Sequence, residues 1–303
     1  MKDIPLMPAA LLLVTASLFG FGTVTTAAEE PITPTAGSIN LLENDLERCY
    51  TFLRDTKYDD PLRVYSLQDG VLQVSGESWG GLTTKAEYAN YHMVVEFKWG
   101  ERTWGDRKDR ARDSGIMFHG IGPDGGYGGV WLASLEAQII EGGVGDILAV
   151  PGKTPEDKPI PISISAETTT DRDNEAVWKQ GGQKRTFGSG RINWYGRDPD
   201  WSDKLGFRGR NDVDSPHGEW TRYEIICDGD KVTLVVNGIV VNKGFAAKPS
   251  AGKILIQSEG AEIYVRRWEL WPLGKAPPAK RPLAMPAVPD VIQASRIDSV
   301  RYD

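Results

Sequence analysis

The sequence has few cysteines, few histidines and no long apolar run beyond its first thirty residues. Its only cysteines are Cys49 and Cys227, too few for a disulfide framework, so they either form one bridge or remain buried thiols. The three histidines include no His-x-x-x-His pair and no cysteines cluster, so a dedicated zinc site is unsupported. A divalent cation held by carboxylates and carbonyls remains open as a cofactor.

The chain also lacks an excess of positive charge. Its formal net charge of −7 repels phosphate backbones, so we expect no nucleic-acid partner. No later stretch is long and apolar enough to cross a bilayer, so we expect no stable membrane insertion of the mature chain. Ten Trp and ten Tyr favour a carbohydrate substrate, because flat aromatic rings stack on sugar faces.

The first 28 residues have the pattern of a signal peptide. Lys2 precedes an apolar segment at 11–19, and Ala27 and Ala28 provide the small residues of a cleavage site. A membrane anchor is the alternative, although the apolar segment is short for a span. We therefore expect a secreted or periplasmic protein, with a signal peptide at 1–28 and a polar leader at 29–48.

The remaining sequence reads as β-structure, since no helical periodicity extends beyond about three turns. The segment 91–99 alternates, with Met93, Val95, Phe97 and Trp99 on one side. Further strand candidates follow at regular spacing, separated by Gly and Asn turns. The pattern predicts an all-β sandwich or barrel over residues 49–274.

Two regions interrupt this pattern. Residues 150–217 are polar yet contain Trp178 and Trp194, so we expect a long irregular insertion. That insertion is either a decoration with its own small core or a wall over a binding face. The Pro-rich tail at 275–303 is expected to be an extended strap or a disordered end.

The segment 136–141 is the most informative for chemistry. On a strand, Glu136 and Gln138 share a face, and Glu141 joins them only through a β-bulge. The spacing is similar to the Glu-x-Asp-x-x-Glu strand of retaining glucanases with a concanavalin-like fold, where two carboxylates flank the glycosidic bond. Gln138 cannot relay a proton but can hold a sugar hydroxyl. Glu136 and Glu141 are therefore candidate catalytic residues, and Gln138 a candidate substrate contact.

A second group of candidates lies on or beside the strand expected at 115–119. Arg112 and Asp113 are candidate substrate contacts, and His119 is either a catalytic imidazole or a structural histidine. His217, at the end of the insertion, is a candidate for the same cleft. The candidate substrate contacts also include Lys85 and Trp194.

A series of short motifs resembles the 3-keto-disaccharide hydrolase domain family, from about Cys49 to Leu273. Each motif is weak alone, and their shared order gives the resemblance its specificity. Asp113 departs from the family's frequent Asn, His119 from an Arg and Glu141 from an Asp. The matching segments are 69–72, 81–85 with 88–91, 113–116, 135–141, 218–220, 236–238 and 252–260, followed by Arg266 and Arg267.

This resemblance implies a concanavalin A-like jelly-roll sandwich and activity on glycosides whose glucose C3 hydroxyl is oxidised to a ketone. A ketone at C3 acidifies the proton on C2, so a base can remove it and the C1 substituent departs by elimination. From residue type and position, we expect Glu136 or His119 as the base and Gln138 as a hydroxyl contact. Arg112 or a divalent cation would stabilise the enolate oxygen.

Two other functions stay open at this point. A non-catalytic lectin-like module fits the replacement of a catalytic acid by Gln138, and concanavalin-like sandwiches serve many functions. The second of these alternative hypotheses is a conventional retaining glucanase.

Overall fold

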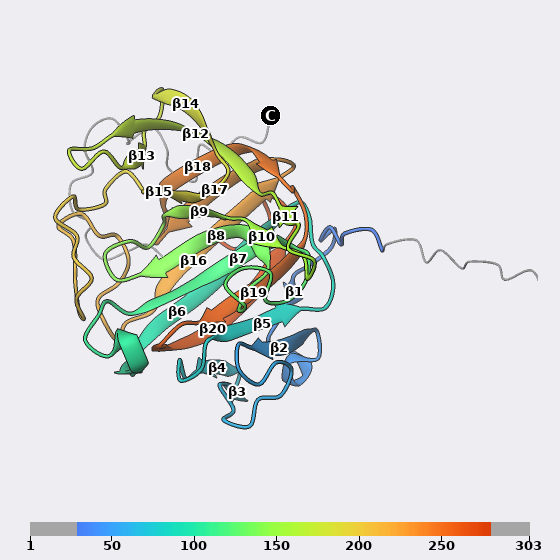
Figure 1. The fold of residues 1–303 in the computed structure, drawn as a ribbon. Coiled ribbons are helices and arrows are strands. Elements are labelled where there is room, and N and C mark those ends of the chain that lie inside the picture. The colour runs from blue at the N-terminus through green and yellow to red at the C-terminus, as the bar shows by residue number, and fades with distance from the viewer. Residues whose placement is uncertain (1–28, 280–303) are drawn as a thin grey trace, which may run out of the picture. The chain divides into compact units, whose positions relative to one another are not determined.

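A computed structural model describes residues 29–279, and nearly all of their regular structure is β-strand. Two antiparallel sheets form the layers of a sandwich (Figure 1). The expected signal peptide at 1–28 and the tail from 280 onward lie outside the described residues. Within residues 29–279, none of the helices has the length and hydrophobicity that a membrane span requires.

One layer is a seven-stranded sheet that carries the segment 136–141. Its order is β15 (Gly190–Ile192), β9 (Ile147–Val150), β8 (Ala133–Ile140), β7 (Asp113–Ile121), β19 (Lys253–Ser258), β5 (Gly80–Thr84) and β2 (Cys49–Leu53).

The other layer is an eleven-stranded sheet. Its main path is β13 (Ala176–Trp178), β12 (Ser163–Thr170), β18 (Ile239–Lys248), β17 (Lys231–Val236), β16 (Thr221–Asp228), β6 (Tyr91–Thr103), β20 (Ala261–Trp271), β4 (Val71–Val74) and β3 (Tyr65–Gln68). Strand β1 (Ile39–Asn40) pairs with β20, and β14 (Gln183–Phe187) pairs with β12. A separate ribbon joins β10 (Gly152–Lys153) to β11 (Pro159–Ile160), and the helices are short 3₁₀ turns at Asn44–Leu46 and Gly105–Arg107.

The main core lies between the two sheets and follows from strand alternation. The apolar side of β6 is the one that the sequence predicts, and it packs in the same cluster as Leu135, Ala137 and Ile139 of β8. Cys49 and Cys227 are both buried and unbridged, so the thiol alternative holds. Because Leu135, Ala137 and Ile139 face this core, Glu136 and Gln138 project from the opposite side of the seven-stranded sheet.

From residue 32 onward, the segment expected to be a leader packs as part of the domain. The backbone N–H of Ile32 donates to the Glu87 carbonyl at 2.8 Å, and β1 adds to the edge of β20. Leu41 and Leu42 are buried in the main core. Burying these two leucines stabilises the packing of the leader by an amount on the order of a few kcal/mol.

The segment 150–217 is more regular than the sequence suggests. Strands β10 to β15 occupy its first part. On β12, buried Ile164 and Ala166 alternate with more polar positions, which is the pattern of a strand with one face toward the core. Residues 194–220 carry no helix or strand. The insertion therefore adds β12, β13 and β14 to the eleven-stranded sheet and β15 to the seven-stranded sheet before it becomes irregular.

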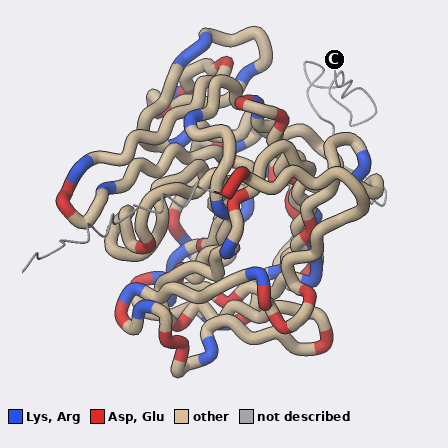
Figure 2. The backbone as a smooth tube through the Cα atoms, turned by 90° about the vertical axis from the view of Figure 1, so that its right-hand side faces the viewer, with Lys and Arg blue, Asp and Glu red and all other residues tan. Residues whose placement is uncertain are grey.

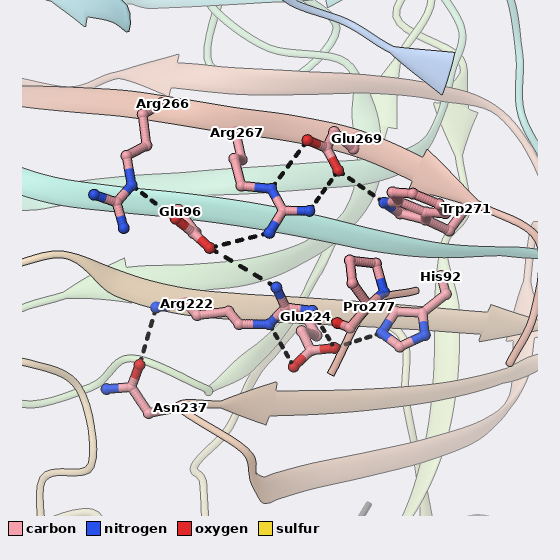
Figure 3. A network of polar contacts seen from close by, with 10 residues as sticks. All are labelled: His92, Glu96, Arg222, Glu224, Asn237, Arg266, Arg267, Glu269, Trp271 and Pro277. Carbon is pink, nitrogen blue, oxygen red and sulfur yellow. Dashed lines mark hydrogen bonds and ion pairs between the residues drawn. The ribbon is translucent and has the colours of Figure 1, made fainter. Parts of the chain in front are cut away.

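Charged side chains cover the outer face of β6, β16 and β20 (Figure 3). His92 contacts Glu224 at 2.6 Å, and Arg222 donates to the same Glu224 carboxylate. Arg222 also donates to the Pro277 carbonyl at 2.7 Å, so this network fastens the segment after β20 to the sheet. His92 is thus structural, as its position on a long strand suggests.

Candidate active site

The neighbouring strands β7 and β8 bring the predicted acid and amide groups onto one face. Gly115 pairs with Gln138 and Met117 pairs with Glu136, so Asp113, two residues before Gly115, projects from the same side. The register from Leu135 to Ile140 is continuous, so no bulge returns Glu141 to this face. The site consequently centres on Glu136, Gln138 and Asp113.

Gly115 makes the close approach of two polar side chains possible. A Cβ atom at this position would lie 2.4 Å from Glu136 Oε1 and 2.4 Å from Gln257 Oε1. The Glu136 carboxyl and the Gln257 amide therefore occupy the space that any larger residue would fill. Gln257 comes from β19, on the other side of β7, and its amide lowers the pKa of the Glu136 carboxyl.

A second set of hydrogen bonds fixes Gln138. Its Nε2 donates to Asp113 Oδ1 at 2.7 Å, and Arg107 donates to the other Asp113 oxygen. Both Asp113 oxygens are thus engaged. The amide oxygens of Gln138 and Gln257 are buried, yet neither accepts a hydrogen bond from any described residue. Such acceptors suit a polar ligand, because a buried oxygen without a partner is costly.

The pKa values of the two carboxyls on this face are raised to different extents. Burial, and then the negative charge of Asp113, raises the pKa of Glu136 to about 8, while Arg191 opposes the shift. Burial also raises the pKa of Asp113, to about 6, against the lowering effect of Arg107 and Arg191. Near neutral pH, Asp113 is mainly ionised and Glu136 exchanges its proton readily. Carboxyl groups whose pKa values are shifted by burial and by a specific charged neighbour indicate candidate functional sites.

A third acid belongs to the same electrostatic group. Burial, followed by the charges of Asp113 and Glu136, raises the pKa of Glu259 well above its ordinary value. Arg107 and Arg191 act in the other direction. The charges of Arg107 and Arg191 thus act on all three acids, although Arg107 also pairs with Asp203 and Arg191 with Asp146.

An apolar patch adjoins the polar group. Met117 and Leu255 pack there with Trp131, in a cluster separate from the main core. Trp79 lies against this cluster, and its ring stacks on Trp131 with the centroids 5.6 Å apart. Trp131 donates its Nε1–H to the Gly80 carbonyl at 3.0 Å, which holds the indole in place. Flat rings beside carboxyls and amides provide the two kinds of contact that a sugar requires.

Access to the polar group is limited. Glu136 is 4% exposed and Gln138 3% exposed, although both project away from the core between the sheets. A substrate must therefore reach them through a small part of their surface.

Glu141 and Arg112, two of the predicted site residues, pair with each other instead. Arg112 Nη1 lies 2.7 Å from Glu141 Oε1, and the Arg112 backbone N–H donates to Glu141 Oε2 at 2.9 Å. Gly206, in the irregular part of the insertion, also donates to this carboxylate, at 2.7 Å. The pair therefore anchors the insertion to the ends of β7 and β8.

His119 and Trp194 lie in the interior of the sandwich. His119 is fully buried beside Tyr91 and Phe118, and its Nδ1 lies 3.1 Å from the Pro249 carbonyl. Burial lowers its pKa to about 4, so the imidazole is neutral. Trp194 belongs to the main core cluster. The structure does not group either side chain with Glu136, because both face the core rather than the outer side.

Lys85 and His217 lie elsewhere on the surface. Lys85 is exposed and donates to the Glu47 carbonyl at 2.7 Å. His217 Nε2 lies 3.0 Å from the Gly100 carbonyl, which also accepts a hydrogen bond from Arg112. His217 thus neighbours the Arg112–Glu141 anchor and does not contact the Glu136 group.

Sequence reasoning missed four polar residues and the tryptophan pair Trp79 and Trp131. Gln257 and Glu259 alternate with Leu255 near the end of β19, so the motif at 252–260 already held the signal for one face. Arg107 and Arg191 carried no local signal, because one lies in a 3₁₀ turn and the other in the insertion.

Metal binding has no obvious centre. Among residues 29–279, no group of three or more His, Cys, Asp or Glu side chains is arranged to hold a metal ion. The described residues therefore provide no set of ligands for the divalent cation that the sequence left open as a cofactor.

The sequence matches the model of the 3-keto-alpha-glucoside-1,2-lyase-like domain over residues 50–270. The chain belongs to this family. The match includes the strands that carry Asp113, Glu136 and Gln257, and it gives the chain a carbohydrate-related function. No curated protein matches the chain.

Several solved structures are similar to this chain. A protein assigned as a glycosyl hydrolase from Parabacteroides distasonis is 17% identical, covering 78% of this chain and 100% of its own, with a TM-score of 0.44. The beta-glucanase of Bacillus licheniformis is 10% identical, covering 78% and 99%, with a TM-score of 0.39. The carbohydrate-binding module CBM66 of Bacillus subtilis is 8% identical, covering 68% and 89%, with a TM-score of 0.37.

Proposed function

We propose that the protein cleaves 3-keto-glycosides by removing the proton on C2 and eliminating the substituent at C1. The observation that carries this proposal is the Glu136 carboxyl, which is buried, has a pKa of about 8 and lies beside two amide oxygens without partners. A general base works best when its pKa lies near the operating pH. Family membership supports the 3-keto substrate.

Glu136 is the better base of the two acids on the central strands. Both oxygens of Asp113 accept hydrogen bonds from protein groups, whereas the pKa of Glu136 is lowered only by the Arg191 charge and the Gln257 amide. In this proposal the ionised Glu136 takes the C2 proton, and the electron pair moves through the enolate to expel the C1 oxygen. The resulting carboxylic acid then provides a proton for the leaving group. Water adds to the unsaturated sugar to complete net hydrolysis.

Substrate contacts follow from the same face. The free oxygens of Gln138 and Gln257 would accept hydroxyl protons, and the half-buried Trp79, supported from beneath by Trp131, would contact a sugar ring. Arg191 is the candidate for the enolate oxygen, because its side chain is 30% exposed and its charge acts on both Glu136 and Asp113.

The ordinary retaining glucanase is less well supported. That mechanism needs two carboxyls flanking the glycosidic bond. Here the acid position of the motif is Gln138, and Glu141 is tied to Arg112 and Gly206. The Glu136–Glu141 spacing therefore does not provide the required pair.

A matched pair of substrates tests the proposal. We expect aglycone release from a 3-keto-glucoside and none from the ordinary glucoside, and Glu136→Gln should lower the rate by about 10²–10⁴-fold. Release from both substrates would point to a glucanase, and binding without release to a lectin-like module. Full activity of Glu136→Gln on the keto substrate would show that the base is another residue.

A further inference from the structure

A groove on the eleven-stranded sheet arises where the insertion joins it. Strand β12 pairs with β18 at Ser163 and Ser165, and with β13 from Thr168 onward. Between these two pairings lies Glu167, which forms part of the wall of a groove of about 390 Å³. This volume falls within the range of small-molecule sites. The groove belongs to a different sheet from Glu136, so it is separate from the candidate active site.

The lining of this groove is basic. Lys184, Lys231 and Lys243 project from three different strands, against the single acid Glu167. Glu167 Oε2 already accepts a hydrogen bond from the Gly181 N–H at 2.7 Å. Over most of the backbone, acidic and basic residues are interspersed (Figure 2). In the groove, by contrast, no described carboxylate lies within ion-pair distance of the three lysines. An unpaired cluster of ammonium groups favours an anionic ligand.

The groove also offers aromatic surface. Trp178 and Phe245 line it, and the Lys184 ammonium lies 5.7 Å from the centre of the Phe245 ring. Lys184 and Glu167 are direct cross-strand partners, and Ser165 on the same strand pairs with Phe245. A small inorganic anion would use the lysines but leave the rings without a function, whereas a sugar ring has an apolar face to place on them.

We propose that this groove is an accessory binding site for an acidic saccharide, with a uronic-acid carboxylate held by Lys231 and Lys243. The lysines would pair with the carboxylate, and Phe245 would support the ring. Because β17 and β18 hold no part of the candidate active site, the groove would attach the protein to an acidic glycan without taking part in bond cleavage.

Titration of the full chain with trigalacturonate tests this site, with galactotriose as the neutral counterpart and inorganic phosphate as the simple anion. We expect trigalacturonate to bind, galactotriose not to bind and phosphate to compete poorly. Lys231→Ala/Lys243→Ala should weaken trigalacturonate binding by about tenfold or more, because each lost charge-assisted contact is costly. The exposed Lys158→Ala is the matched control and should leave binding unchanged.

Calorimetry at low and high salt should show weaker binding at high salt. Absence of trigalacturonate binding, equal affinity in the double variant, or phosphate binding as tightly would each overturn the proposal. Activity on a small neutral 3-keto-glucoside should be the same in the double variant and the wild type. Failure of the groove and failure of the catalytic proposal are therefore separable.

Discussion

At the scale of single residues, the site depends on the environment of Glu136 rather than on an unusual residue type. Burial disfavours its charged form, and the neighbouring Asp113 charge adds to that effect. The same Asp113 accepts the hydrogen bond that orients Gln138. Glu136 can thus exchange a proton near neutral pH. Asp113 orients Gln138 and raises the pKa of Glu136.

Asp113→Asn should move the pH profile of the reaction. Removing the negative charge lowers the pKa of Glu136, so the rise of kcat/KM with pH should occur at a lower pH than in the wild type. The pH dependence of kcat/KM on the 3-keto substrate measures this shift, and the exposed Asp106→Asn is the control. An unmoved profile would show that Asp113 does not tune the base.

Glu136→Gln should make the protein more stable than the wild type at high pH, although it lowers activity. The pKa of Glu136 is about 8 in the folded protein and ordinarily 4.5, so the folded state retains a proton that the unfolded state releases. Wild-type stability attributable to this group therefore falls as pH rises from about 4.5 to about 8. Thermal unfolding from pH 4 to 9 should show that the Tm advantage of the variant grows over this interval.

The exposed Glu156→Gln serves as the matched control for that stability series and should show no such trend. A constant Tm difference between Glu136→Gln and the wild type across the pH range would mean that Glu136 does not titrate as described.

At the scale of strands, the close contact of β7, β8 and β19 assembles the site. Gly115→Ala should lower kcat/KM by about 10²-fold, because the added methyl group would displace the Glu136 carboxyl or the Gln257 amide. Thermal unfolding should confirm that the variant still folds. Gly188→Ala is a suitable control, since its Cβ would meet only the Ile162 carbonyl, at an ordinary 3.7 Å. Wild-type activity of Gly115→Ala would place the substrate elsewhere.

Strand alternation also explains which features of the fold and of the site could be predicted from the sequence. Period-two patterns predicted the apolar side of β6 and the shared face of Glu136 and Gln138, because both are local properties of one strand. The partners of Glu141 and the inward position of His119 were not predictable. They depend on a loop 65 residues away and on a register shift in β7 after Phe118.

At the scale of the whole domain, the residues that stabilise the fold and the residues of the candidate active site lie on different faces of the two sheets. The space between the sheets holds the main core, the outer side of the seven-stranded sheet holds the acids and amides, and the outer side of the eleven-stranded sheet holds ion pairs. Strand spacing predicted a sandwich or a barrel, and the resemblance to the family implied the sandwich. The regular part of the insertion escaped prediction because its short strands are stabilised by pairing with β18 and β9, which lie far apart in the sequence.

The most direct test of the central claim is a kinetic isotope effect at C2 of the sugar. If Glu136 removes that proton during elimination, aglycone release from a 3-keto-glucoside deuterated at C2 should be slower than from the undeuterated substrate. The product formed in heavy water should also acquire solvent deuterium at C2. Equal single-turnover rates for the two substrates, with the original C2 hydrogen retained in the product, would contradict the account.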